Sequence, residues 1–207
     1  MEVKSLKLAF KNLGLETAMR LWTIQSKSVY DILIKKGEYR CTPEKSECLE
    51  EFNFYRSYDW MNAQMEKRVC KKPAGIKYPV WAWHTFEGVH KKPDLRKSDF
   101  RFLREDSVCI EIEIPDSQVL LSNEEDWHMV LNDLFDAKYR NDLDFDSAYE
   151  WYESLSESEK QQVKEKSWEC IFDTTESRYI QATFWELKKE NIVKVWSVKA
   201  RKNSTAC

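Results

Sequence analysis

Apolar and polar residues alternate most regularly between residues 108 and 114. The apolar members of this alternation are Val108, Ile110, Ile112 and Ile114. Because side chains alternate between the two faces of a strand, the pattern predicts a strand with one buried face. Related patterns predict further strands over residues 20–25, 80–84, 179–187 and 192–200.

Other segments follow a helical period. Large apolar residues at spacings of four, three and four, from Phe54 to Met65, predict a helix over residues 46–68. A shorter helix is predicted over 26–36, with Gly37 ending it in the usual C-terminal position. Pairs of serine and glutamate three residues apart predict the starts of three more helices. These pairs are Ser122 and Glu125, Ser147 and Glu150, and Ser156 and Glu159.

The mixture of periods predicts an α+β fold, a compact mixed or antiparallel sheet with several surrounding helices. A chain of 207 residues fits one domain, and 4 glycines and 5 prolines argue against a turn-rich sandwich. Residues 1–18 are set apart as an N-terminal extension, because codons for residues 14–16 can resemble a ribosome-binding site ahead of Met19. We therefore expect the domain to cover residues 19–207, with Met19 as the candidate native start.

The charge balance of the chain as a whole does not favour attraction to a strongly charged partner. The net charge is −3, from 33 basic and 36 acidic residues, so no global field attracts nucleic acid or anionic lipid. Basic clusters over 67–72 and 91–104 are interpreted as solvated faces. No apolar run is long enough to span a membrane and no signal-peptide core is present, so we expect no membrane partner and a cytoplasmic protein. None of the 6 cysteines forms a Cys-x-x-Cys pair, and we expect reduced thiols.

Tryptophan recurs beside polar residues in four separate blocks. These blocks are residues 20–25 (RLWTIQ), 79–84 (PVWAWH), 126–128 (DWH) and 181–186 (QATFWE). Indole is bulky and its N–H needs a partner when buried, which suits the wall of a cleft. The blocks therefore predict an aromatic cleft with a few polar groups.

Metal and nucleophilic chemistry lack support in the sequence. The three histidines, His84, His90 and His128, do not have the spacing of a helical metal site, so no metal is expected. The chain has neither a Gly-x-Ser-x-Gly elbow nor a glycine-rich phosphate loop.

The order of the first and last blocks resembles that of ADP-ribosyltransferase-like domains, which use NAD. The resemblance implies that Glu186 is the catalytic group, orienting the nicotinamide ribose and stabilising positive charge as nicotinamide leaves. It implies further that Arg20 and Thr23 contact the phosphates or ribose, and that Trp83 and His84 line the pocket. The chain departs from that pattern, because Gln181 stands five residues before Glu186 rather than two and the middle strand lacks a Ser/Thr-rich signature.

The N-terminal stretch, with Gly37–Arg40 after the first helix, also resembles ASCH/PUA-like RNA-binding barrels. This alternative implies a non-enzymatic module for nucleic acid or another small planar ligand, with Trp81, Trp83 and Trp185 as stacking surfaces. A third interpretation places most of the tryptophans in the core.

A set of motifs is similar to a bacterial family of uncharacterised proteins, domain of unknown function 3841. The motifs are 20–25 (RLWTIQ), 58–65 (YDWMNAQM), 79–83 (PVWAW), 93–96 (PDLR), 119–132 (VLLSNEEDWHMVLN) and 181–185 (QATFW). The resemblance runs from about residue 19 to the end of the chain and implies no activity.

Overall fold

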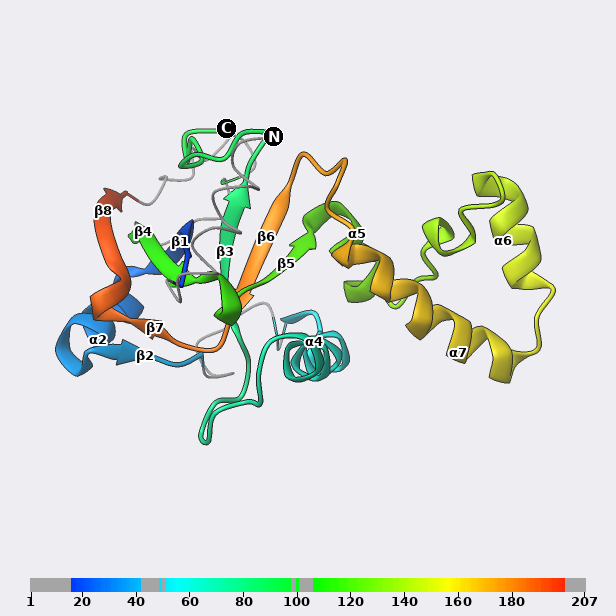
Figure 1. Ribbon diagram of the computed structural model, residues 1–207, viewed down its shortest axis with the longest axis horizontal. Coiled ribbons are helices and arrows are strands. Elements are labelled where there is room, and N and C mark those ends of the chain that lie inside the picture. Colours follow the sequence, from blue (N-terminus) through cyan, green and yellow to red (C-terminus); the bar gives the residue numbers. More distant parts are fainter. Residues whose placement is uncertain (1–15, 42–48, 50, 98–99, 101–105, 200–207) are drawn as a thin grey trace, which may run out of the picture.

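The computed structural model describes residues 16–41, 49, 51–97, 100 and 106–199. Six strands form one sheet in the order β5-β6-β3-β1-β4-β8, and every neighbouring pair is antiparallel (Figure 1). The strands are β1 (Ala18–Ser26), β3 (Val80–Thr85), β4 (Ser107–Pro115), β5 (Leu120–Asn123), β6 (Ile180–Phe184) and β8 (Ile192–Val198). Two short strands, β2 (Glu38–Tyr39) and β7 (Leu187–Lys188), pair separately. The predicted α+β fold is confirmed.

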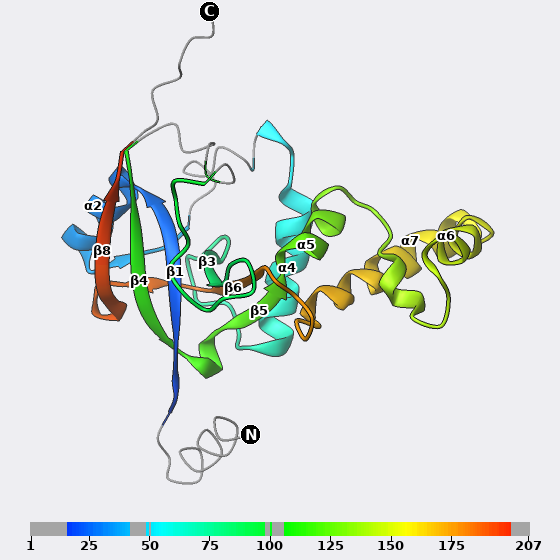
Figure 2. The ribbon, with the colours of Figure 1, turned by 90° about the horizontal axis from the view of Figure 1, so that it is seen from above.

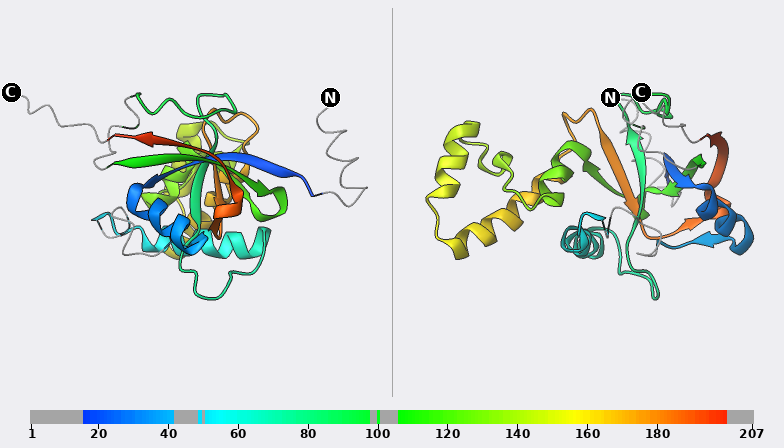
Figure 3. Two further views of the ribbon diagram at one scale, coloured as in Figure 1. Left: turned by 90° about the vertical axis from the view of Figure 1, so that its left-hand side faces the viewer. Right: turned by 180° about the vertical axis from the view of Figure 1, so that it is seen from behind.

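Among the described residues, five α-helices accompany the sheet. They are α2 (Lys27–Lys36), α4 (Tyr55–Arg68), α5 (Glu124–Leu131), α6 (Phe145–Glu153) and α7 (Glu157–Ser167). Helices α6 and α7 form an arm that projects away from the sheet (Figures 1 and 2). The sheet is strongly twisted, so that β1, β4 and β8 cross the direction of β3 and β6 (Figure 3). None of the described helices is both long and apolar enough to cross a lipid bilayer.

The two faces of the sheet carry different side chains. One face, here called the aliphatic face, includes Leu21, Ile110 and Ile112, and it packs against Val29 and Leu33 of α2. The opposite face, here called the aromatic face, carries the indoles of β1, β3 and β8. The strand registers place Gln181, Trp83, Trp22, Glu111 and Lys194 in one row across this face.

Helix α2 has the predicted ends. Its N-cap is Ser26, whose hydroxyl accepts a hydrogen bond from the Val29 amide at 3.3 Å. Gly37 has φ 84° and its amide donates to the Leu33 carbonyl at 2.9 Å. A left-handed residue with no Cβ ends the helix here and turns the chain into β2.

The predicted helix over 46–68 is not continuous: residues 49 and 51 are helical, but α4 itself begins only at Tyr55. Residues 52–54 form a turn, and Asn53 has φ 54°, which a helix does not allow. Residues 42–48 and 50 lie outside the described part. The predicted apolar stripe holds within α4, where Met61 and Met65 are fully buried.

All three helices predicted from these pairs are present, but only one has the predicted capping residue. Ser156 and Glu159 form the capping box of α7. Helix α5 is capped by Asn123, whose side-chain oxygen accepts a hydrogen bond from the Glu125 amide at 3.0 Å. Helix α6 is capped by Asp144, so Ser147 lies inside the helix.

Two other predictions, on the N-terminal extension and on the cysteines, concern residues of which only some are described. Thr17 and Ala18, assigned to the extension, join the sheet: Thr17 bonds to Asp116, and Ala18 pairs with Pro115. Residues 1–15 lie outside the described part. The four described cysteines, at positions 41, 70, 109 and 170, are not joined in disulfides.

Candidate functional site: an aromatic cleft

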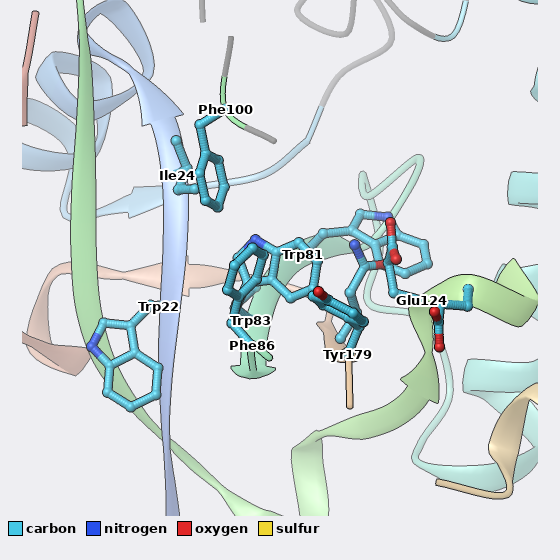
Figure 4. Close-up of a pocket in the computed structure, with 11 residues that line it drawn as sticks. Trp22, Ile24, Trp81, Trp83, Phe86, Phe100, Glu124 and Tyr179 are labelled. Atoms are coloured by element: carbon cyan, nitrogen blue, oxygen red, sulfur yellow. The ribbon is translucent and has the colours of Figure 1, made fainter. Parts of the chain in front are cut away.

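A cleft of about 500 Å³ opens on the aromatic face. Its described lining consists of Trp22, Ile24, Trp81, Ala82, Trp83, Phe86, Phe100, Glu124, Glu125, Tyr179 and Gln181. Trp81 and Trp83 lie in the middle of the group in Figure 4, with Ile24 and Phe100 to one side and Glu124 to the other. The cleft thus joins β1, β3 and β6 to the first turn of α5.

Strand alternation places the indoles in the cleft. Trp81 and Trp83 are two residues apart on β3, so both side chains leave the same face. Trp22 of β1 is the cross-strand partner of Trp83, and Gln181 of β6 is its partner on the other side. An aromatic wall with an amide beside it follows from this register.

The indoles of the wall are held by other rings. Trp81 lies against Trp127, with ring centroids 4.9 Å apart, and against Tyr58 at 6.0 Å. Trp83 meets Phe86 edge-on at 4.9 Å. Such contacts fix the orientation of each ring, so the wall is organised before any ligand arrives.

The cleft side chains that carry hydrogen-bond acceptors include Glu124, Glu125 and Gln181. Glu124 and Glu125 stand in the first turn of α5, where the helix dipole favours negative charge. Glu124 also lies 3.2 Å from His128 Nε2. The Gln181 Oε1 atom is buried and has no hydrogen-bond partner in the described residues. A buried acceptor without a partner is costly, and a ligand that donates a hydrogen bond would remove that cost.

Of the five residues predicted to form the site, Trp83 lines the cleft. His84 does not belong to its described lining. A register shift between Trp83 and Thr85 leaves His84 without a pairing partner in β6. Its Nδ1 lies 2.9 Å from the Thr85 hydroxyl, and its ring centroid lies 4.2 Å from that of His90.

Arg20 and Thr23 point to opposite faces of β1, because they are three residues apart on one strand. Thr23 is fully buried, donates to the Trp81 carbonyl at 2.8 Å and accepts from the Gln25 amide at 2.6 Å. It has no surface to offer a ligand in this conformation. Arg20 is half exposed and forms ion pairs with Glu113 at 2.7 Å and Glu111 at 3.3 Å.

Glu186 follows β6 at the end nearer to β2. Its carboxylate lies 2.7 Å from the Arg40 guanidinium and 3.9 Å from Lys188 Nζ. The structure therefore gives Arg20, Thr23 and Glu186 separate sets of partners, and none of the three belongs to the described lining of the cleft.

Two further tryptophans act as core residues. Trp185, predicted as a stacking surface, is only 5% exposed, and its Nε1 donates to the Cys70 carbonyl at 3.2 Å. Trp168 donates in the same way to the Leu134 carbonyl at 2.8 Å. Their satisfied N–H groups contrast with the Nε1 atoms of Trp22 and Trp81, which are buried without a partner in the described residues.

Sequence reasoning missed Glu124, Glu125, Phe86 and Tyr179 as lining residues. The two glutamates were visible only as part of a helix start, and their proximity to the indoles depends on the pairing of β5 with β6. Nothing local to Phe86 or Tyr179 indicates that they contact each other, with ring centroids 5.3 Å apart.

The remaining candidates for chemistry are placed as structural groups. Burial raises the pKa of the Cys109 thiol to about 12, so this residue of β4 stays protonated at neutral pH. Across the described ranges, no three residues of the types His, Cys, Asp and Glu gather in a way that could hold a metal ion.

Comparison with known proteins gives a family without an activity. No curated protein matches the chain, and no solved structure matches it. The family model described as "Domain of unknown function (DUF3841)" matches residues 20–193, a span that includes β3, β6 and all of β1 except its first two residues, and hence the strands of the cleft. The chain therefore belongs to the DUF3841 family.

Proposed function

We propose that this protein is a binding module that accepts a planar, nitrogen-rich ring, such as a nucleobase, in its aromatic cleft. The observation that carries the proposal is the row Gln181, Trp83 and Trp22, which sets an unpartnered buried acceptor beside indoles on one face of the sheet. Any nucleobase can stack on an indole, because every base has a π face.

The polar side chains of the cleft indicate which kind of planar ring it can bind. Gln181 Oε1 and the carboxylates of Glu124 and Glu125 all accept hydrogen bonds. A ligand with an exocyclic amino group or ring N–H would supply the donors. The same carboxylates disfavour a phosphate at that end of the cleft, so the ring and not a phosphate is expected to occupy it.

NAD-dependent ADP-ribosyl transfer requires Arg20, Thr23 and Glu186 around one nicotinamide ribose. Their separate partners do not favour that arrangement, and the positions of Thr23 and Glu186 would both have to change. Transfer by Glu186 stays a prediction, and NAD cleavage is the measurement that tests it.

The proposal can be tested by calorimetric titration with a panel of nucleosides. Trp83→Ala should weaken binding by about 1–3 kcal/mol, or about 5- to 150-fold, because stacking on that indole is lost. Trp151→Ala is the matched control: this indole lies in α6 of the arm, beneath Arg140 at 4.3 Å, and its loss should leave affinity unchanged. Equal affinities for wild type and Trp83→Ala, or no binding of any nucleoside, would remove the proposal.

A further inference from the structure

The aromatic face carries a second hollow, a groove of about 370 Å³ beside β8. Lys92, Leu95, Trp196 and Lys199 are among its lining residues. The strand registers pair Ile24 with Cys109 and Cys109 with Trp196, so the groove and the cleft share one face of the sheet. Both rest on the same core cluster, which includes Phe86, Leu95 and Phe100 and against which Trp83 and Trp196 pack.

Two lysine ammonium groups lie close to the indole ring of Trp196. The Lys194 ammonium lies 5.1 Å and the Lys92 ammonium 5.4 Å from its ring centroid. A cation over an indole is attracted by the ring, which helps to hold two like charges near each other. Among the described residues, no carboxylate forms an ion pair with either lysine.

Several other cations of the described residues, including two in the groove, are paired with carboxylates. Lys67 and Arg68 both pair with Glu169, at 3.0 and 2.9 Å. In the groove itself Arg96 pairs with Asp94 at 2.8 Å, and Lys199 with Asp106 at 3.1 Å.

The carboxylate directly across the strand pair from Lys194 is bound by another cation. Glu111 is the cross-strand partner of Lys194, but its carboxylate lies 3.3 Å from Arg20. The Lys92 and Lys194 pair is therefore a local positive site on a protein whose net charge is −3.

We propose that a single-stranded nucleic acid lies along the aromatic face, with one base in the cleft and a phosphodiester on Lys92 and Lys194. This inference rests on the proposed function and names the ligand of the same site. The cleft strand β3 and the groove strand β8 are separated by β1 and β4, a distance of about 14 Å at the usual strand spacing. One nucleotide is too short to connect its base to its phosphate over that length, so the ligand is an oligonucleotide.

The charges at the two ends also fix how the strand lies. Glu124 and Glu125 repel phosphate at the cleft end, and the two lysines attract it at the groove end. The flexible backbone of a single strand can leave one base unstacked for the cleft, which a paired base in a duplex cannot do without opening.

The test is fluorescence anisotropy with short labelled RNA and DNA single strands of mixed sequence, and with the same strands as duplexes. Wild type should lose about 2.6-fold in affinity as salt rises from about 50 to about 200 mM, the dependence expected for one neutralised phosphate of a single strand. Lys92→Gln/Lys194→Gln should bind more weakly at low salt and show almost no salt dependence. The charge-matched control is Lys35→Gln/Lys36→Gln, two exposed lysines in the last turn of α2, and it should behave as wild type.

Free nucleosides separate this inference from the proposed function. Lys92→Gln/Lys194→Gln should bind nucleosides as wild type does, while Trp83→Ala should not. Oligonucleotide affinity that is insensitive to both lysines, or duplex binding as tight as single-strand binding, would overturn the phosphate site and leave the cleft standing. Lysine-dependent oligonucleotide binding without any nucleoside binding would support the phosphate site and remove the cleft.

Discussion

The two faces of the six-stranded sheet carry different kinds of hydrophobic residue, and the two kinds have different roles. The aliphatic face is built mainly from Leu, Ile, Val and Ala side chains, and helix α2 packs against it through Val29 and Leu33. The aromatic face carries Trp22, Trp81, Trp83 and Trp196, and part of it stays open as a cleft and a groove. Residues that fill space without needing a partner close one face, while residues with a polar handle are retained on the face that remains accessible.

The difference extends to buried polar atoms. On the aromatic face, the Nε1 atoms of Trp22 and Trp81 and the Oε1 atom of Gln181 are buried without partners in the described residues. On the aliphatic face, the buried hydroxyl of Thr23 both donates and accepts. Unmet hydrogen-bonding capacity beside an open hollow distinguishes a candidate site from core packing.

The largest effect should come from the aliphatic face. Ile110→Ala removes a fully buried side chain from β4, and it should lower the free energy of unfolding by about 2–5 kcal/mol because a cavity remains. Urea denaturation measures this, and nucleoside affinity of the folded variant should stay at the wild-type value. If Ile110→Ala lost more binding free energy than free energy of unfolding, the two faces would not have separate roles in binding and stability.

Gln181→Leu tests the unpartnered acceptor of the aromatic face. Affinity for a nucleoside with an amino group should fall by about 0.5–1.5 kcal/mol, the usual net value of one hydrogen bond. The free energy of unfolding should not fall, because no hydrogen bond within the described protein is lost. If Gln181→Leu unfolds more easily but binds as before, the amide belongs to the core and not to the site.

Glu186→Gln separates the binding interpretation from the transferase hypothesis. The ion pair with Arg40 is partly exposed, so its loss should change the free energy of unfolding by less than about 1 kcal/mol. Nucleoside binding should not change, since Glu186 lies outside the described lining of the cleft. NAD cleavage by wild type that disappears in Glu186→Gln would instead support the transferase hypothesis.

The variant Asp136→Asn tests whether an unpartnered buried oxygen always indicates a ligand site. Asp136 Oδ2 has no partner in the described residues, and burial raises the pKa of this carboxyl above its ordinary value of 3.8. The folded state thus holds the proton more tightly than the unfolded state, so this group's contribution to stability is lost as pH rises through the raised pKa. Asparagine keeps the oxygen that accepts from the Lys138 amide and removes the charge.

The expected result is a free-energy difference between Asp136→Asn and wild type that favours the variant more at pH 7 than at pH 4. Urea denaturation at about these two pH values measures it. A difference that is independent of pH would show that burial of Asp136 carries no electrostatic cost. Ligand affinity should be the same in both proteins, because Asp136 lies outside the lining of the cleft.

Local patterns in the sequence predicted most of the elements and some of the site. Period-two alternation located β1, β3, β4 and β8, and it also implies that Arg20 and Thr23 lie on opposite faces. The family resemblance placed both in one site against that implication. The start of α4 was missed because the left-handed conformation of Asn53 interrupts an otherwise helical pattern.

The rest of the site depends on contacts between distant segments. Gln181 reaches Trp83 through the pairing of β3 with β6, and Lys92 reaches Trp196 across about half of the chain. Such proximity is decided by strand order, which periodicity within one segment does not contain. The tryptophan blocks could therefore predict an aromatic cleft, but they could not tell Trp83, which lines it, from Trp185, which is buried.

The ligand is expected to contact the indoles of the aromatic face and not the indoles of the core. The most direct test is a ¹H–¹⁵N spectrum of the indole N–H groups of all 9 tryptophans during titration with a nucleoside. The resonances of Trp81 and Trp83 should move, while those of Trp168 and Trp185, bonded to backbone carbonyls, should stay in place. Shifts confined to Trp168 and Trp185, or no shifts at saturating nucleoside, would contradict the claim.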